Sequence, residues 1–254
     1  MLEARNLGKF YSGIPAVKDV NFTVRRGEVL GLLGPNGSGK STTVSMITSL
    51  LEPTTGQVLF DGESISRAPL EFKARVGYVP EEAHLYSYLT GPEYLELVGQ
   101  LRGLDAAVLR GRIAAFMRIF GLEDDQHSQM GAYSKGMRQK ILIAAALLHD
   151  PDVIVLDEPN SGLDVTSALI LRSLVLELAA SGKIIVYSSH VLEIVEKVAT
   201  DVLILHESRV VAHDSVSRLR ELMALPSLEQ VLRRVVVAGD VEQMARDLVE
   251  VMKL

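Results

Sequence analysis

A glycine-rich segment with a single lysine, Gly34-Pro-Asn-Gly-Ser-Gly-Lys-Ser41, has the residue types and spacing of a phosphate-binding loop. It fits the pattern G-x-x-x-x-G-K-[ST]. Glycines let successive backbone N–H groups turn inward around a phosphate, and the amino end of a following helix adds positive partial charge. In such a loop Lys40 reaches the β and γ phosphates of a nucleotide, and Ser41 holds Mg²⁺. The residues expected to contact the nucleotide are Gly34, Pro35, Asn36, Gly37, Ser38, Gly39, Lys40, Ser41 and Thr42.

Two adjacent acids, Asp157 and Glu158, follow the apolar run Val153–Leu156. Such a run is typical of a strand that is buried on both faces. A carboxylate at the end of a buried strand is unfavourable unless it meets a cation, so Asp157 is a natural ligand for Mg²⁺ and its water shell. Glu158 can then orient or deprotonate an attacking water. The alternative is a pair of exposed acids that cap the next helix, and the phosphate-binding loop favours the nucleotide site.

The elements that must hold these residues alternate between strand and helix. The run Val29–Leu33 predicts a buried strand before the glycine-rich loop, and a helix should follow it from about Ser41 to Leu51. Further along, the predicted elements are a helix from Ser134 to Leu148, a strand at 153–156, a helix from about 165 to 180, and a strand at 183–187. This alternation predicts a parallel sheet with helices on both faces.

The remaining segments predict additions to this α/β core. Residues 2–6 and 19–24 indicate an antiparallel β edge, and a strand pair at 202–205 and 210–213 closes the sheet. Helical periodicity over 92–120 indicates a mostly helical insert at about 85–150. We therefore expect a domain at 1–216 with a P-loop NTPase core. A short helical extension should follow at 217–254, with helices at 215–223, 228–234 and from Asp240 onward.

The composition excludes several classes of protein. The chain has 254 residues, of which 48% are hydrophobic and 23% charged, and this excludes a disordered or fibrous chain. A net charge of −6 provides no global basic field for nucleic acid, and the absence of cysteine excludes disulfides and thiolate chemistry. The longest apolar run, Ile141–Leu148, is too short to span a bilayer. With no secretory signal at its start, the chain is expected in the cytoplasm, and any membrane span must come from another protein.

A further motif indicates a second anion site. Ser134-Lys-Gly-Met-Arg-Gln139 resembles the signature of the ATP-binding cassette (ABC) ATPases, which is usually Leu-Ser-Gly-Gly-Gln. In this chain Tyr133, Lys135 and Met137 depart from that pattern, while the serine and the second glycine remain. The basic residues Lys135, Arg138 and Lys140 could alternatively form a solvated face.

Other motifs of that family follow in the same order. Ser161–Asp164 resembles the D-loop, and His190 resembles the switch histidine, although it could instead cap a helix. Tyr11 lies where the family stacks an aromatic ring on adenine, although it could be a simple edge-strand residue. Val76–Pro80 precedes the position of the Q-loop glutamine, where this chain has Glu81. The resemblance covers about residues 2 to 217 with six motifs.

The resemblance implies ATP and Mg²⁺ as cofactors, with Ser41, Glu81 and Asp157 near the metal and Lys40, Glu158 and His190 as catalytic residues. Ser134 and Gly136 would form a second half-site, since a helix N-terminus attracts anions and the glycine-rich loop already supplies the first. Two half-sites in one chain indicate head-to-tail pairing, either as a homodimer or with a related ATPase.

The expected function is the ATPase subunit of an ABC transporter that works with a separate membrane-spanning permease on the inner face of the membrane. Glu81-Glu82, the signature variant and residues 85–90 are similar to the exporter branch. A soluble ABC ATPase that acts as an assembly or scaffold factor is the alternative. A nucleic-acid partner is disfavoured by the acidic balance and the single cassette.

Overall fold

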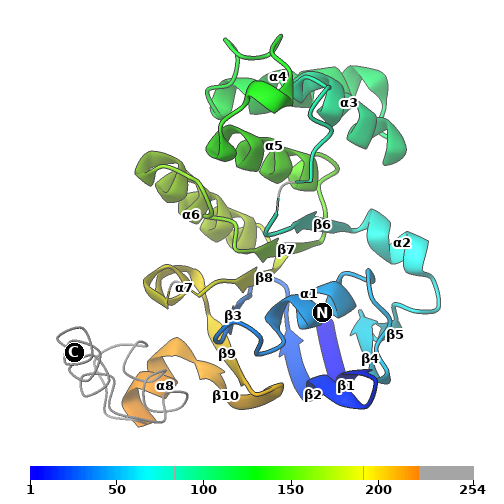
Figure 1. Ribbon diagram of the computed structural model, residues 1–254, viewed down its shortest axis with the longest axis vertical. Helices are drawn as coiled ribbons and strands as arrows, with labels where there is room; N and C mark the ends of the chain where they lie inside the picture. Colours follow the sequence, from blue (N-terminus) through cyan, green and yellow to red (C-terminus); the bar gives the residue numbers. More distant parts are fainter. Residues whose placement is uncertain (83, 191, 223–254) are drawn as a thin grey trace, which may run out of the picture.

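The computed structural model describes residues 1–82, 84–190 and 192–222, and two β-sheets form the framework of this part of the chain (Figure 1). The larger sheet has the strand order β10-β9-β3-β8-β7-β6. Its strands are β3 (Val29–Leu33), β6 (Val76–Val79), β7 (Val153–Asp157), β8 (Ile184–Ser188), β9 (Asp201–His206) and β10 (Arg209–Ser215). All neighbouring strands are parallel except β9 and β10. The predicted mostly parallel sheet is therefore confirmed.

The central strands of this sheet are buried on both faces. Every residue of β3, β7 and β8 is buried. Along β3, Leu30 and Leu32 belong to one hydrophobic cluster, while Val29 and Leu33 belong to another on the opposite face. Removal of these branched side chains from water is the main stabilising contribution, at about 1.5–3 kcal/mol for each fully buried residue. This explains why the strands are continuous apolar runs in the sequence.

Helices cover the two faces of the larger sheet. Helix α1 (Lys40–Ile47) lies on one side, between the two sheets, while α6 (Val165–Ala180) and α7 (Leu192–Val198) lie on the other (Figure 1). The bounds of α6 agree with the prediction. Helix α1 ends before the predicted Leu51, because Ser49 adopts a left-handed conformation with φ of 59° that no α-helix accommodates.

The smaller sheet is antiparallel and has the order β2-β1-β4-β5. Its strands are β1 (Leu2–Tyr11), β2 (Ile14–Val24), β4 (Thr55–Phe60) and β5 (Glu63–Ser64). Strands β1 and β2 are longer than predicted, since they continue to the two-residue turn Ser12-Gly13, in which both residues have positive φ. Strands β4, β5 and β6 were not predicted from the sequence.

The helical insert stands at the end of the molecule opposite the antiparallel sheet (Figure 1). It contains α3 (Gly91–Leu101), α4 (Ala106–Ile119), the short 3₁₀ helix η1 (Met130–Ala132) and α5 (Lys135–Leu147). The helical periodicity predicted over 92–120 corresponds to two helices, because Gly103 turns the chain with φ of 72° and Asp105 caps the amino end of α4.

Two short helices complete the described chain, α2 (Pro69–Ala74) and α8 (Val216–Leu222). Helix α8 agrees with the helix predicted at 215–223. The helices predicted at 228–234 and from Asp240 onward lie outside the described residues.

Parallel strands bring their carboxyl ends to one edge of the sheet. At that edge the glycine-rich loop follows β3, Asp157 ends β7 and Glu158 follows it, His190 follows β8, and Glu81 follows β6. Ligands of open parallel sheets bind in the crevice outside these ends. The fold therefore collects residues from four distant parts of the sequence in one place.

His149, just after α5, gives the fold a sensitivity to mild acid. Its Nε2 lies 3.1 Å from the Val76 carbonyl oxygen, and its Nδ1 is buried without a partner among the described residues. Burial, together with the nearby charge of Arg102, lowers the pKa of His149 to about 4. The imidazole is therefore neutral in the folded protein at pH 7 and donates its single N–H to Val76.

We expect His149→Gln to reduce the loss of stability in mild acid. The pKa of His149 in the folded protein lies below the unfolded value of about 6.5. The contribution of the neutral imidazole to folding stability is therefore fully present above pH 6.5 and is lost as the pH falls toward 4. After allowance for partial solvent exposure, the effect at pH 5 is about 1 kcal/mol, or about 2–4 °C in Tm. Thermal unfolding at pH 7 and pH 5 measures it, with the exposed His127→Gln as the control. Equal acid losses in the wild type and His149→Gln would contradict this role.

Candidate functional site

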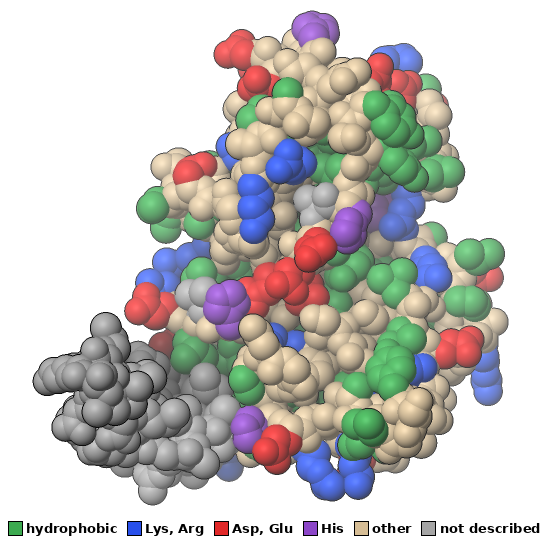
Figure 2. Space-filling model, viewed as in Figure 1, with side chains coloured by type: hydrophobic (Ala, Val, Ile, Leu, Met, Phe, Trp, Pro, Cys, Tyr) green, Lys and Arg blue, Asp and Glu red, His purple; other side chains and the backbone are tan. Residues whose placement is uncertain are grey.

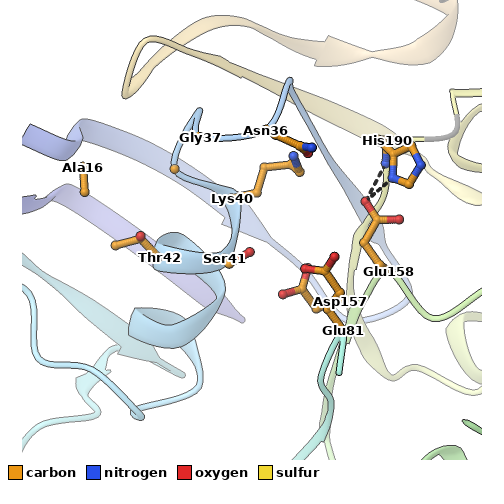
Figure 3. Close-up of a pocket in the computed structure, with 11 residues that line it drawn as sticks. Ala16, Asn36, Gly37, Lys40, Ser41, Thr42, Glu81, Asp157, Glu158 and His190 are labelled. Atoms are coloured by element: carbon orange, nitrogen blue, oxygen red, sulfur yellow. Dashed lines mark hydrogen bonds and ion pairs between the residues drawn. The ribbon is translucent and has the colours of Figure 1, made fainter. Parts of the chain in front are cut away.

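A cavity of about 600 Å³ opens at the carboxyl edge of the parallel sheet (Figure 3). Its wall combines the glycine-rich loop, the start of α1, one residue of β2 and the residues that follow β6, β7 and β8. The lining residues are Ala16, Asn36, Gly37, Gly39, Lys40, Ser41, Thr42, Glu81, Asp157, Glu158 and His190. Ten of them were predicted as site residues from the sequence, and Ala16 was not.

The glycine-rich loop needs its glycines for both conformation and space. Gly34 and Gly39 have φ of 151° and 107°, a region that side chains disfavour. A Cβ atom on Gly34 would lie 2.3 Å from the carbonyl oxygen of Leu205, and one on Gly39 would lie 2.5 Å from that of Ala16. The loop therefore takes this path only because the two positions lack side chains.

Lys40 is a buried cation at the first residue of α1. Its side-chain nitrogen donates to the carbonyl oxygens of Gly34 and Pro35 at 2.7 and 3.2 Å. Burial lowers the pKa of Lys40, and the nearby carboxylates of Glu158, Asp157 and Glu81 oppose that shift. Within the same loop, the buried hydroxyl of Ser38 has no partner among the described residues. These donors and the helix N-terminus together fit the phosphate groups of a nucleotide.

Acidic side chains face Lys40 across the cavity. Asp157 is only 3% exposed, and burial raises its pKa, as do the neighbouring charges of Glu81 and Glu158, whereas Lys40 lowers it. Glu81 lies beside Asp157 (Figure 3), and Figure 2 shows acidic side chains gathered in the middle of this face with histidine side chains near them. A buried carboxylate with acidic neighbours is stabilised by a cation.

The oxygen donors of Ser41, Asp157 and Glu81 suit a hard cation such as Mg²⁺. Within residues 1–82, 84–190 and 192–222, no group of three or more His, Cys, Asp or Glu residues could hold a metal by itself. Mg²⁺ typically uses one or two carboxylates and completes its octahedron with water and substrate phosphates. The donor set therefore fits a metal that binds together with a nucleotide.

Glu158 is held in a fixed orientation. Its Oε1 accepts a hydrogen bond from the backbone N–H of His190 at 2.8 Å and lies 2.7 Å from His190 Nδ1, and its Oε2 accepts from the Ser189 hydroxyl at 3.2 Å. Glu158 itself has φ of 47°, which is uncommon for a residue with a side chain. Its backbone N–H donates to the carbonyl oxygen of Ser188 at 3.0 Å. Strain of this kind persists where surrounding contacts enforce it, as at functional sites.

Six predicted site residues lie outside the cavity wall. Tyr11 ends β1, is 51% exposed and has the Lys9 side-chain nitrogen 5.6 Å from its ring centre. Ser134 caps α5, where its hydroxyl accepts from the backbone N–H of Met137 at 3.2 Å. Gly136 lies in the first turn of the same helix. Of the glycine-rich loop, Gly34, Pro35 and Ser38 shape the backbone without lining the cavity.

Sequence reasoning missed two contributors to the site. Ala16 comes from the antiparallel sheet, and a single small residue in a strand gives no signal of proximity to a distant loop. Ser189 holds Glu158 through its hydroxyl, a role that depends on the pairing of β7 with β8. Both contacts are tertiary.

Known proteins share this sequence pattern and architecture. The family model described as ABC transporter matches residues 17–161. The ABC transporter ATP-binding protein NatA of Bacillus subtilis is 39% identical over 227 residues, which cover 89% of this chain and 92% of NatA. A solved ATP-binding subunit of an ABC transporter is 34% identical, with a TM-score of 0.87 over 92% of this chain and 99% of that subunit. A dimeric, post-hydrolysis structure of the ATP-binding cassette MJ0796 with ADP and Pi is 25% identical, with a TM-score of 0.76 over 85% and 98% of the two chains.

We expect Lys40→Ala to reduce ATP turnover by at least about 10²-fold and to weaken ATP binding. The change removes the buried positive charge that faces the phosphates, in a site where preorganised charge supplies much of the catalysis. Steady-state hydrolysis and nucleotide affinity of the purified protein measure both effects. Lys183→Ala, which removes a lysine paired with Asp150 outside the cavity, is the control. Turnover by Lys40→Ala at the control rate would refute the assignment of the loop.

Proposed function

This chain belongs to the ABC transporter family of ATP-binding subunits, and from that premise we propose that it uses Mg²⁺ and ATP to drive a separate membrane-spanning partner, with export as the direction of transport. The observation that carries the proposal is the convergence of Lys40, Asp157 and Glu158 on one cavity. A cation for phosphate, a buried acid for the metal and a fixed carboxylate for water are the parts that phosphoryl transfer requires.

The predicted site residues have proposed roles in nucleotide binding and hydrolysis. The backbone of the glycine-rich loop and Lys40 bind the phosphates, and Ser41, Asp157 and Glu81 would hold Mg²⁺, which neutralises phosphate charge when bound. Glu158 orients the attacking water and accepts its proton. His190 holds Glu158 in position and contributes a contact to the γ-phosphate. The exposed ring of Tyr11 offers a face for adenine.

Two subunits are proposed to pair head to tail. Ser134 and Gly136 lie outside the cavity wall of their own chain, at the amino end of α5. They can therefore contribute an anion site to a nucleotide held by another subunit. The dimeric structure of the MJ0796 cassette supports the pairing of two such subunits. Because one chain carries both halves of the site, a homodimer would have two complete sites, and a related ATPase could replace one copy.

A groove of about 350 Å³ beside the cavity is the proposed docking place of the membrane partner. Its wall includes Val76, Pro80 and His84 together with Val98 and Leu142 of the helical insert. Exposed Leu50, Tyr86 and Tyr88, at 59%, 52% and 65%, add apolar surface on nearby segments. Apolar surface of this kind is typical of protein interfaces.

The segment around Glu81 links this groove to the nucleotide. Glu81 lines the cavity, while Pro80 and His84 line the groove. A shift of Glu81 with the metal would therefore move residues that contact the partner. This arrangement supports coupling between hydrolysis and the partner.

No helix in residues 1–82, 84–190 and 192–222 has the length and hydropathy to cross a bilayer. The proposed location is the inner face of the membrane, through the partner. Pull-down from detergent-solubilised source cells tests the partner: a co-purifying multi-span membrane protein supports the transporter. Recovery of soluble partners alone would instead favour an assembly factor.

We expect Glu158→Gln to bind ATP but to hydrolyse it at least about 10²-fold more slowly, because the amide keeps the shape of the side chain without its basicity. The variant should accumulate as an ATP-bound dimer. Size-exclusion chromatography with MgATP detects that dimer, and Glu123→Gln on the distant helical insert is a matched control. A monomeric Glu158→Gln protein that hydrolyses ATP at the control rate would contradict both the base and the pairing.

We expect Glu81→Gln to keep ATP affinity within about twofold and to change the stimulation of hydrolysis by the membrane partner. The change removes a negative charge beside the proposed metal site without shortening the side chain. ATP turnover of the reconstituted complex, with and without the partner, measures the effect. Glu123→Gln is the control, since Glu123 is exposed and lies outside both the cavity wall and the groove. Identical stimulation in the two variants would show that the charge is incidental.

A further inference from the structure

The turn that follows Glu158 is fastened to the first turn of α5. Within the turn, the backbone N–H of Ser161 donates to the carbonyl oxygen of Glu158 at 3.0 Å. This bond closes the chain immediately after the residue with φ of 47°. The conformation of Glu158 therefore depends on where Ser161 is held.

Lys135, the first residue of α5, holds Ser161. Its side-chain nitrogen donates to the Ser161 hydroxyl at 2.7 Å. Its aliphatic stem crosses Gly162, where a Cβ atom would lie 2.6 Å from Lys135 Cγ. Two hydrogen bonds thus connect the Lys135 ammonium to the backbone of Glu158, one through the Ser161 hydroxyl and one through the Ser161 N–H.

Two further contacts bring the same surfaces together. A Cβ atom on Gly136 would lie 2.7 Å from the carbonyl oxygen of Gly162, so the two backbones approach closely. Gln139, only 2% exposed, donates to the carbonyl oxygen of Pro159 at 3.1 Å. The turn after Glu158 therefore contacts α5 at three positions of the turn, Pro159, Ser161 and Gly162.

A lysine at this position is unusual on electrostatic grounds. The amino end of a helix carries positive partial charge, so a cation at its first residue is unfavourable, and the first turn of α5 contains no acid to offset it. The side chain is also not a freely solvated charge, because it lies along Gly162 and ends on the Ser161 hydroxyl. Its position is explained by the turn that it holds.

We propose that Lys135 is a positioning residue for Glu158. By holding Ser161, it keeps the turn closed and the Glu158 carboxylate aimed into the cavity. The inference rests on the proposed role of Glu158 in hydrolysis. It also has a consequence for the pair of subunits. Ser134, next to Lys135, is proposed to contact the nucleotide of the second subunit, so that contact is linked through Lys135 and Ser161 to the position of Glu158 in the same chain as Ser134.

The experiment compares variants of the full chain in steady-state ATP hydrolysis. Lys135→Met keeps the stem over Gly162 and removes the ammonium, and Ser161→Ala removes the acceptor. Each should lower kcat by about fivefold to tenfold, as for loss of one charge-assisted hydrogen bond, and leave KM for ATP within about twofold. The double variant should be no slower than either single variant, and Lys135→Arg should recover most of the rate.

Controls separate positioning from other roles. Lys197→Met, on the exposed face of α7, should leave kcat unchanged, and the Tm of Lys135→Met should match that of Lys197→Met. In the Glu158→Gln background, Lys135→Met should produce no additional loss of turnover and should leave the ATP-bound dimer intact.

Several results would overturn the proposal. One is an unchanged kcat in Lys135→Met. Another is a double variant whose kcat falls by the product of the two single effects. A third is a Tm of Lys135→Met low enough to account for its loss of turnover. A raised KM or loss of the ATP-bound dimer in Lys135→Met would instead show direct contact with the second subunit's phosphates. Failure of the proposed function is a separate outcome, since it appears as normal turnover in Glu158→Gln whatever Lys135→Met does.

Discussion

Opposite charges held out of water at one edge of a parallel sheet are the constraint on which the rest of this structure depends. Lys40 and Asp157 are 8% and 3% exposed. Burial lowers the pKa of Lys40 and raises the pKa of Asp157, so in each case it favours the neutral form. Neither charge is stable there without its neighbours. The glycine-rich loop supplies carbonyl oxygens to Lys40, and Lys40 in turn lowers the pKa of Asp157. The site is therefore an electrostatic unit, which a nucleotide and the proposed metal would complete.

The rigidity of the sheet explains how strained backbone can persist at this edge. Glu158 follows directly from β7, a strand buried on both faces and paired with β6 and β8. Hydrogen bonds from His190 and Ser189 hold its carboxylate, while α5 holds the turn that follows. The stability of the core thus maintains a left-handed residue where the proposed chemistry needs it. Through α5, the helical insert therefore also helps to hold Glu158 in its conformation, although α3 and α4 of the insert lie away from the parallel sheet (Figure 1).

The sequence predicted those elements whose local pattern agrees with their final environment. Continuous apolar runs identified β3, β7 and β8, and the helices α5 and α6 were predicted between the strands. It did not predict β4 or β6. Strand β6 is four residues long and β4 is exposed over its first half, so neither presents a clear apolar period. The early end of α1 also escaped prediction, since the left-handed Ser49 has no sequence signal comparable to glycine.

By itself, the sequence determined the chemistry of the site, because the glycine-rich loop and the Asp157–Glu158 pair are contiguous motifs with specific spacing. It could not determine which distant residues support them. Ala16 enters the cavity from the other sheet, and Lys135 reaches the turn after Glu158 from the helical insert. Such contacts depend on how sheets and helices pack, and packing joins residues whose separation along the chain carries no periodic signal. The residue pattern determined the secondary structure and the local motifs, and tertiary packing determined which residues meet at the site.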